Sequence, residues 1–178
     1  NISCPNTFGG EPFADPQKLE LLLSRISDLK ITKPTFLKMP INLSWTEFKA
    51  LLDIAVKYKV SGVIIGNLNK NREDNAIVER ISKETKGSLS GLPCQALSNE
   101  LITKTFAEFG QKLIIIGVGG IFTAADAYEK IKRGASLVQL ITGMIYEGPQ
   151  LIGQINQQLV SFLKKDGYTN VSQAVGAY

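Results

Sequence analysis

The alternation of short apolar runs with amphipathic segments is the feature that most restricts the fold of this chain. "SGVIIGN" (61–67) and "KLIIIGVGG" (112–120) are continuous β-branched runs, which are typical of buried strands. Segments with a helical spacing of apolar residues separate such runs. Buried strands joined by helices predict a parallel β-sheet with helices packed outside it. The sequence therefore predicts an α/β protein.

Cap and stop residues set the expected limits of the helices. Asp15 and Pro16 provide an N-cap and a first helical residue, and Ser44 with Glu47 forms a capping box. Further helices are expected from Ser98 to about Gly110, between Thr123 and Gly134, and from Pro149 to Gly167, with one helical turn in the tail (170–178). Strands are expected at 1–3, 34–40, 61–67, 112–120 and 135–142.

Two arrangements of these parallel strands compete, a doubly wound sheet and an eight-stranded (β/α)8 barrel of the TIM type. The glycines favour the barrel, because "GVGG" follows the penultimate strand and "TG" (142–143) follows the last, where such barrels bind phosphate. Phe122 stands in place of the third glycine of a dinucleotide-binding motif, so that motif is not supported. About five of eight strands are present. Residues 1–178 are therefore interpreted as a single partial barrel domain, running from the fourth strand to the C-terminus of a longer protein whose N-terminal half is absent.

Composition and charge exclude several classes of function. The 178 residues are 44% hydrophobic, enough for a sizeable core, and the net charge is +4. Lys and Arg residues are interleaved with acids, as in "NKNRED" and "AYEKIKRG", which is typical of solvated faces rather than of a nucleic-acid-binding stripe. The lack of histidine excludes histidine-based triads, and Cys4 and Cys94 lack metal-ligand spacing, so no metal site is expected. The apolar stretch 113–125 is too short to cross a bilayer.

Two reactive side chains stand where strands of such a barrel would end. Cys4, in "NISCPNT", is either a small buried hydrophobe or a base at the mouth of the barrel, and both interpretations stay open. Lys38, in "TFLKMP", points to the opposite side of its strand from Leu37 and Met39. An ammonium inside a barrel needs an anionic partner, which predicts a bound anion or anionic cofactor. The alternative is a lysine that extends to solvent from the strand end.

Amides, glycines and hydroxyls at other strand ends suit a planar, phosphorylated ligand. The amide of Asn67 offers both a donor and an acceptor, or else serves only a turn. Backbone N–H groups and a hydroxyl without side-chain bulk, as phosphate binding requires, are offered by Gly119, Gly120, Thr142 and Gly143. Ser90 and Gly91, in "GSLSGLP", either close over the same ligand or form a connecting loop.

Taken in order, these residues resemble dihydroorotate dehydrogenase, a flavin barrel of pyrimidine biosynthesis. The matching segments span the whole chain: "NISCPNT", "LKMP", "GVIIGN", "SLSG", "IIIGVGGI", "GASLVQLITGMIY" and "VSQAVGA". The resemblance implies FMN as cofactor, with its phosphate on Gly119, Gly120 and Thr142 and its ring against Lys38. It also implies cofactor contacts from Asn1, Gly66, Gly91 and Ile141, and substrate contacts from Asn1, Asn6, Asn67 and Leu68.

The same resemblance implies the reaction. Cys4 would remove a proton from C5 of dihydroorotate as hydride leaves C6 for the flavin, which yields orotate for UMP biosynthesis. The last strand and the tail look like the quinone-linked class, whereas a cysteine base belongs to the soluble classes of the family. Leu68 and Ile141 also depart from the quinone-linked pattern. Quinone is the expected electron acceptor, and fumarate and NAD stay open.

Two alternatives accompany this interpretation. A flavin barrel like that of dihydropyrimidine dehydrogenase also uses a cysteine base. Otherwise, the 178 residues are a non-catalytic fragment that pairs with the remaining barrel half or with itself, because half a barrel leaves strand edges and an apolar interior uncovered. Two lone cysteines and no visible membrane span suggest a cytoplasmic protein. Any peripheral contact with the inner membrane is expected from a segment N-terminal to this chain.

Overall fold

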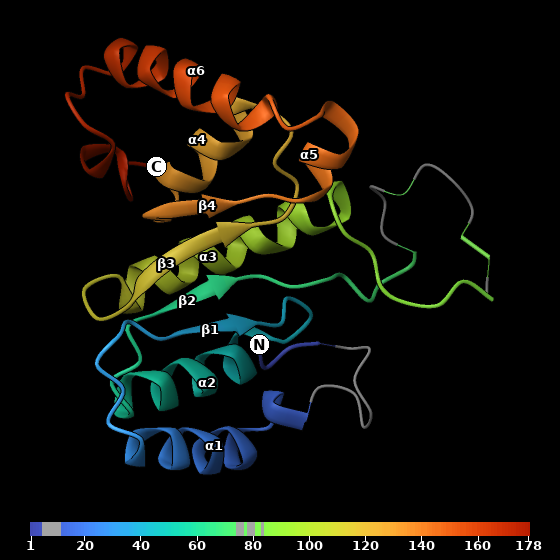
Figure 1. The fold of residues 1–178 in the computed structure, drawn as a ribbon, viewed down its shortest axis with the longest axis vertical. Helices are drawn as coiled ribbons and strands as arrows, with labels where there is room; N and C mark the ends of the chain where they lie inside the picture. Colours follow the sequence, from blue (N-terminus) through green and yellow to red (C-terminus); the bar gives the residue numbers. More distant parts are fainter. Residues whose placement is uncertain (5–11, 74–76, 78–80, 83) are drawn as a thin grey trace.

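In the described part of the chain, four parallel strands form one sheet (Figure 1). The computed structural model describes residues 1–4, 12–73, 77, 81–82 and 84–178. The strands are β1 (Phe36–Met39), β2 (Gly62–Ile65), β3 (Ile114–Val118) and β4 (Leu137–Gln139), and they pair in the order β1-β2-β3-β4. Leu37 pairs with Val63, which in turn pairs with Ile115. Consecutive strands are thus neighbours, and the predicted α/β class with a parallel sheet is confirmed.

Helices connect the strands and follow the last one. They are α1 (Pro16–Asp28), α2 (Trp45–Lys57), α3 (Gln95–Phe109), α4 (Ala124–Lys132), α5 (Thr142–Glu147) and α6 (Leu151–Lys165). Short 3₁₀ turns are η1 (Pro12–Ala14), η2 (Leu92–Cys94) and η3 (Val171–Ala174), and η3 is the helical turn expected in the tail. In Figure 1 the strands follow one another upward from β1 to β4, with α1 and α2 below them and α6 at the top.

Three of the helices begin at the caps predicted from the sequence. The Asp15 carboxylate accepts the Lys18 N–H at 3.0 Å, directly before α1. Ser44 with Glu47 forms a reciprocal capping box on α2, and Thr123 with Asp126 forms another on α4. These bonds satisfy backbone donors that a helix start leaves unpaired. Gly134 follows α4 with a φ of +119°, which explains why a glycine ends this helix.

Two sequence predictions about helix α3 and the N-terminal segment are wrong. Residues 1–3 are not a strand, although the Ile2 N–H donates to the Lys38 carbonyl of β1 at 3.4 Å. One backbone bond places this segment beside β1 without forming a ladder. Ser98 does not cap α3, because η2 runs directly into the helix at Gln95. The buried hydroxyl of Ser98 donates instead to the Gln95 carbonyl at 3.1 Å.

The C-terminal boundaries also differ from those expected. The last strand stops at Gln139 rather than at residue 142, and α5 follows it where no helix was predicted. A Cβ on Gly143 would lie 2.2 Å from the Ile121 carbonyl oxygen, so the first turn of α5 packs closely against the segment after β3. That approach is a tertiary contact, so local propensity does not reveal it. Helix α6 begins at Leu151, two residues after Pro149.

The main core lies between the sheet and helices α1 to α3. Side chains of β1 alternate, so that Leu37 and Met39 are buried in this core while Phe36 and Lys38, on the opposite face, are half-buried. A second core joins α4 to α6 through Ile121, Ala127, Leu151 and Ile155. Burying a large aliphatic side chain contributes roughly 1.5–3 kcal/mol, so these two cores account for how the helices are held on the sheet.

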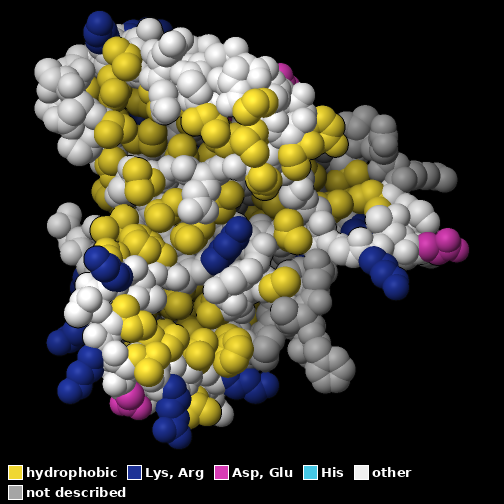
Figure 2. All heavy atoms as spheres, viewed as in Figure 1, with side chains coloured by type: hydrophobic (Ala, Val, Ile, Leu, Met, Phe, Trp, Pro, Cys, Tyr) yellow, Lys and Arg dark blue, Asp and Glu magenta, His cyan; other side chains and the backbone are white. Residues whose placement is uncertain are grey.

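Charged side chains only partly follow the expected solvated pattern. Figure 2 shows Lys and Arg side chains scattered over the viewed face rather than gathered in a stripe. In "AYEKIKRG", however, Lys130 is 0% exposed, so the prediction of a fully solvated face is wrong at this residue. Its side chain lies between α4 and α3, where the packing of two helices covers it. Within the described residues, no helix is both long and apolar enough for a membrane span.

Candidate active site

A cleft opens at the carboxyl ends of the strands, where the loops that follow them meet. Nine of the twelve predicted site residues line it. The full lining is Lys38, Gly66, Asn67, Leu68, Ser90, Gly91, Cys94, Val118, Gly119, Gly120, Ile121, Leu140, Ile141, Thr142 and Gly143. The carboxyl ends of parallel strands are where α/β folds place ligands, so the position suits a binding site.

Lys38 reaches this cleft because of the alternation along β1. Its half-buried side chain lies on the face opposite the buried Leu37 and Met39. It forms no ion pair with another residue that the structure describes, and it is the charged residue of the cleft lining. A half-buried ammonium without a carboxylate partner favours an anionic ligand.

The N-terminal segment is tied to β1 and to the end of β2 through Ser3. The hydroxyl of this fully buried serine donates to the Lys38 carbonyl at 2.7 Å. The Asn67 side-chain amide donates to the Ser3 carbonyl at 2.7 Å and to its hydroxyl oxygen at 2.9 Å. The Asn1 side-chain oxygen accepts the Ser3 N–H at 3.1 Å. Asn1 and Asn67, both predicted to hold a planar ligand, therefore also hold the segment that carries Cys4.

Cys4 follows this network directly and is half-buried. The predicted ligand residue Asn6 lies outside the described residues. Sequence reasoning missed Ser3, for which the sequence offers only a weak signal, its place next to the candidate base Cys4. Burial of Ser3 fixes the backbone on the N-terminal side of Cys4, which is what a positioned general base requires.

The glycine loop after β3 is shaped by positive φ angles and by close packing. Gly119 has a φ of +104° and Gly120 a φ of +69°, which L side chains rarely adopt. A Cβ on Gly119 would lie 2.8 Å from the Cys94 Cβ, and one on Gly120 would lie 2.3 Å from the Gln95 Cβ. These glycines thus serve two purposes, since they let η2 and α3 approach the loop and leave backbone N–H groups uncovered by side chains.

The segment after β4 meets the loop that precedes η2. The Thr142 hydroxyl donates to the Ser90 hydroxyl at 3.0 Å. A Cβ on Gly91 would lie 2.9 Å from the Thr142 methyl carbon, so this glycine permits the approach. Ile141 is 56% exposed beside them. The structure therefore brings the predicted phosphate-binding loops and the Ser90–Gly91 loop together, as the sequence suggested for closure over one ligand.

Gly66 and Leu68 flank Asn67 in the cleft. A Cβ on Gly66 would lie 1.8 Å from a methyl carbon of Ile41, so this position has no room for a side chain. Leu68 is half-buried, and its N–H donates to the Asn67 side-chain oxygen at 3.0 Å. Groups of three or more His, Cys, Asp or Glu side chains that could hold a metal are absent from the described residues. The site therefore offers a cation, amides and backbone donors.

Comparison with known proteins assigns the chain to a family. The family model described as dihydroorotate dehydrogenase matches residues 1–163. The chain belongs to the dihydroorotate dehydrogenase family. A relative from Crocosphaera subtropica, named dihydroorotate dehydrogenase (quinone), is 40% identical over 99% of this chain and 48% of its own length. One of the same name from Myxococcus xanthus is 39% identical over 99% of this chain and 49% of its own.

Solved dihydroorotate dehydrogenase structures have the same fold. A ligand-free enzyme from Eimeria tenella superposes with a TM-score of 0.88 at 27% identity, covering 99% of this chain and 54% of that one. The complex of an Eimeria tenella enzyme with ferulenol gives a TM-score of 0.89 at 28% identity. The chain spans about half the length of the dihydroorotate dehydrogenases that it matches. The predicted family and the partial barrel are thereby confirmed.

Proposed function

We propose that the whole protein oxidises dihydroorotate to orotate with FMN as cofactor and quinone as electron acceptor. The observation that carries the proposal is the cleft, which combines the Lys38 ammonium, two positive-φ glycines and a threonine hydroxyl in a member of this family. The names of the curated relatives support quinone. In this view, residues 1–178 form one partial barrel domain that a preceding half completes.

The residues of the cleft fit a flavin phosphate. Gly119 and Gly120 turn where a side chain would collide with η2 and α3, so backbone donors face a ligand instead of side chains. Thr142, the first residue of α5, adds a hydroxyl. We assign the phosphate to these three residues. Further cofactor contacts are proposed from Asn1, Gly66, Gly91 and Ile141.

Bound FMN would supply the acceptor for the hydride that leaves C6 of dihydroorotate. The Cys4 thiolate takes the C5 proton, so that a C5–C6 double bond forms as the hydride departs. Ser3 keeps the backbone before Cys4 in place through its bond to β1. Lys38 places positive charge in the cleft, where it stabilises negative charge that develops during the reaction. Substrate contacts are proposed from Asn1, Asn6, Asn67 and Leu68.

The test uses the full-length protein. We expect it to purify with FMN or to take it up, and dihydroorotate to bleach the flavin absorbance under anaerobic conditions. Dihydrouracil, which lacks the carboxylate, serves as the matched control and should bleach it far more slowly. Reoxidation by a soluble quinone should then exceed reoxidation by fumarate or NAD. A full-length protein that cannot be loaded with FMN would contradict the proposal.

A further inference from the structure

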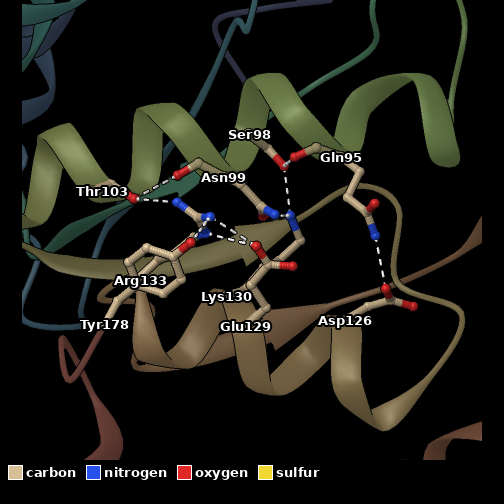
Figure 3. Close-up of polar contacts among 9 residues, drawn as sticks. All are labelled: Gln95, Ser98, Asn99, Thr103, Asp126, Glu129, Lys130, Arg133 and Tyr178. Atoms are coloured by element: carbon tan, nitrogen blue, oxygen red, sulfur yellow. Dashed lines mark hydrogen bonds and ion pairs between the residues drawn. The ribbon is translucent and has the colours of Figure 1, made fainter. Parts of the chain in front are cut away.

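The side-chain amide of Gln95 links the glycine loop to helix α4, and Figure 3 shows its contact with Asp126 on that helix. Its nitrogen donates to the Gly120 carbonyl at 2.6 Å and to the Asp126 carboxylate at 2.9 Å. Gln95 is the first residue of α3, and Asp126 lies in the first turn of α4. Both N–H groups of one amide are thereby used, one on the loop and one on the helix that follows the loop.

The second oxygen of the Asp126 carboxylate holds the rest of the loop. It accepts the Phe122 N–H at 3.0 Å, the Thr123 N–H at 2.9 Å and the Thr123 hydroxyl at 2.8 Å. Charge-assisted hydrogen bonds of this kind are roughly twice as strong as neutral ones. The carboxylate therefore turns these backbone donors toward itself.

The orientation of the Gly120 carbonyl has a consequence for the cleft. In a trans peptide the C=O and N–H point in opposite directions, so a Gly120 carbonyl held by Gln95 turns the Ile121 N–H away from α3. Gly119, Gly120 and Ile121 all line the cleft. Gln95 thus fixes the direction of one backbone donor at the cleft, the Ile121 N–H, while Asp126 engages the two that follow.

The packing of α3 against α4 holds the backbone of Gln95 in place. One turn further along the two helices, the buried Lys130 ammonium donates to the Ser98 hydroxyl at 2.6 Å and to the Asn99 side-chain oxygen at 2.7 Å. Figure 3 shows these contacts between α3 and α4 next to the pair of Gln95 and Asp126. Because the helices cannot shift freely, the Gln95 amide can hold the loop in one orientation.

We propose that Gln95 is a positioning residue for the phosphate of the cofactor. It does not touch the ligand but holds the Gly120 peptide, and Asp126 in turn orients Gln95. The inference rests on the proposed function, in that the ligand is a flavin bearing a phosphate monoester. Its distinctive consequence is that Gln95 affects binding of the phosphate and not binding of the ring.

The experiment compares FMN with riboflavin, which has the same ring and no phosphate, by fluorescence titration of full-length apoprotein. Gln95→Met keeps the side-chain length and removes both donors. We expect it to weaken FMN binding roughly tenfold, the effect of one or two lost hydrogen bonds, and to change riboflavin binding less than about twofold. Gln154→Met, on the exposed face of α6, is the matched control and should leave both affinities unchanged. Gln95→Asn, whose shorter side chain cannot span both partners, provides the same comparison if the methionine variant does not fold.

Three results are informative. A selective loss for FMN supports the positioning role. An equal loss for both flavins, or none for either, overturns it and makes Gln95 a packing residue. If the wild-type protein binds neither flavin, the proposed function itself fails, and this outcome is distinct because it appears before any substitution is made.

Discussion

The buried ammonium of Lys130 should make stability depend on pH in a direction unusual for a lysine. Its partners are the neutral oxygens of Ser98 and Asn99, and they replace water only in part. Burial lowers the pKa of Lys130 from its ordinary 10.5 to about 8, although the nearby carboxylates of Glu129 and Asp126 act in the opposite direction. At neutral pH the ammonium is still protonated, so the folded state bears the free-energy cost of burying its charge.

The sign of this pH dependence follows from the protons that the folded and unfolded states bind. Between pH 8 and 10.5 the unfolded chain holds this proton and the folded chain releases it, so the free energy of unfolding rises with pH. At about 1.36 kcal/mol per pH unit, the difference between 10.5 and about 8 amounts to about 3 kcal/mol. Below pH 8 both states are protonated and the contribution is constant.

The assay is denaturant unfolding of the full-length protein, followed by circular dichroism between pH 7 and 10, for wild type and Lys130→Met. The stability of wild type relative to the variant should rise by about 2.5 kcal/mol between pH 7 and 10, because the last part of the gain lies above pH 10. Methionine leaves the Ser98 and Asn99 oxygens without the Lys130 donor, which costs about 1–3 kcal/mol each and lowers the stability of the variant at every pH. The test is therefore how the stability difference changes with pH, and not its size at any one pH. Lys165→Met, at an exposed position of α6, should run parallel to wild type. A flat difference between wild type and Lys130→Met would refute the reasoning.

Three further predictions concern a buried tyrosine, the base and the glycine loop. Burial, with a hydrogen bond to Asp166, raises the pKa of Tyr128 to about 12, so wild type should lose stability relative to Tyr128→Phe as pH rises above 10. A difference between the denaturation midpoints of the two proteins that is the same at pH 9 and at pH 11 would contradict this. Cys4→Ala should slow anaerobic flavin bleaching by ~10²–10⁴ while FMN stays bound, with Cys4→Ser retaining part of the rate; bleaching at the wild-type rate would make Cys4 a packing residue. Gly120→Ala should weaken FMN binding at least tenfold in a fluorescence titration, because its Cβ would lie 2.3 Å from that of Gln95 at a φ of +69°. The control Gly153→Ala, whose new Cβ meets no atom within 4 Å beyond its own stretch of helix, should instead raise the melting temperature slightly, and equal FMN affinities for the two variants would contradict the prediction.

Local sequence determined most of the elements and the place of the cleft. Ser44 with Glu47, and Thr123 before α4, begin helices because their side chains bond to backbone groups three residues away, which needs no distant partner. Continuous β-branched runs predicted the buried strands, and the glycines after them predicted the loops that now line one cleft. The position of Lys38 in the cleft followed from the alternation of side chains along one strand, β1. Each of these inferences depends on residues near one another in the chain.

Only the tertiary structure decided which side chains are buried or hydrogen-bonded between different helices, strands and loops. Lys130 looks like a solvated lysine in a charged helix, and it is buried because α3 packs over that side of α4. Ser98 looks like a helix cap, yet it is a partner of that lysine. Ser3 and Gln95 carry no local signal strong enough to show that they fix the backbone near Cys4 and Gly120. The physical reason is that burial and long-range hydrogen bonds depend on which helix faces lie together, and a linear pattern gives a helix an apolar side without specifying what covers it.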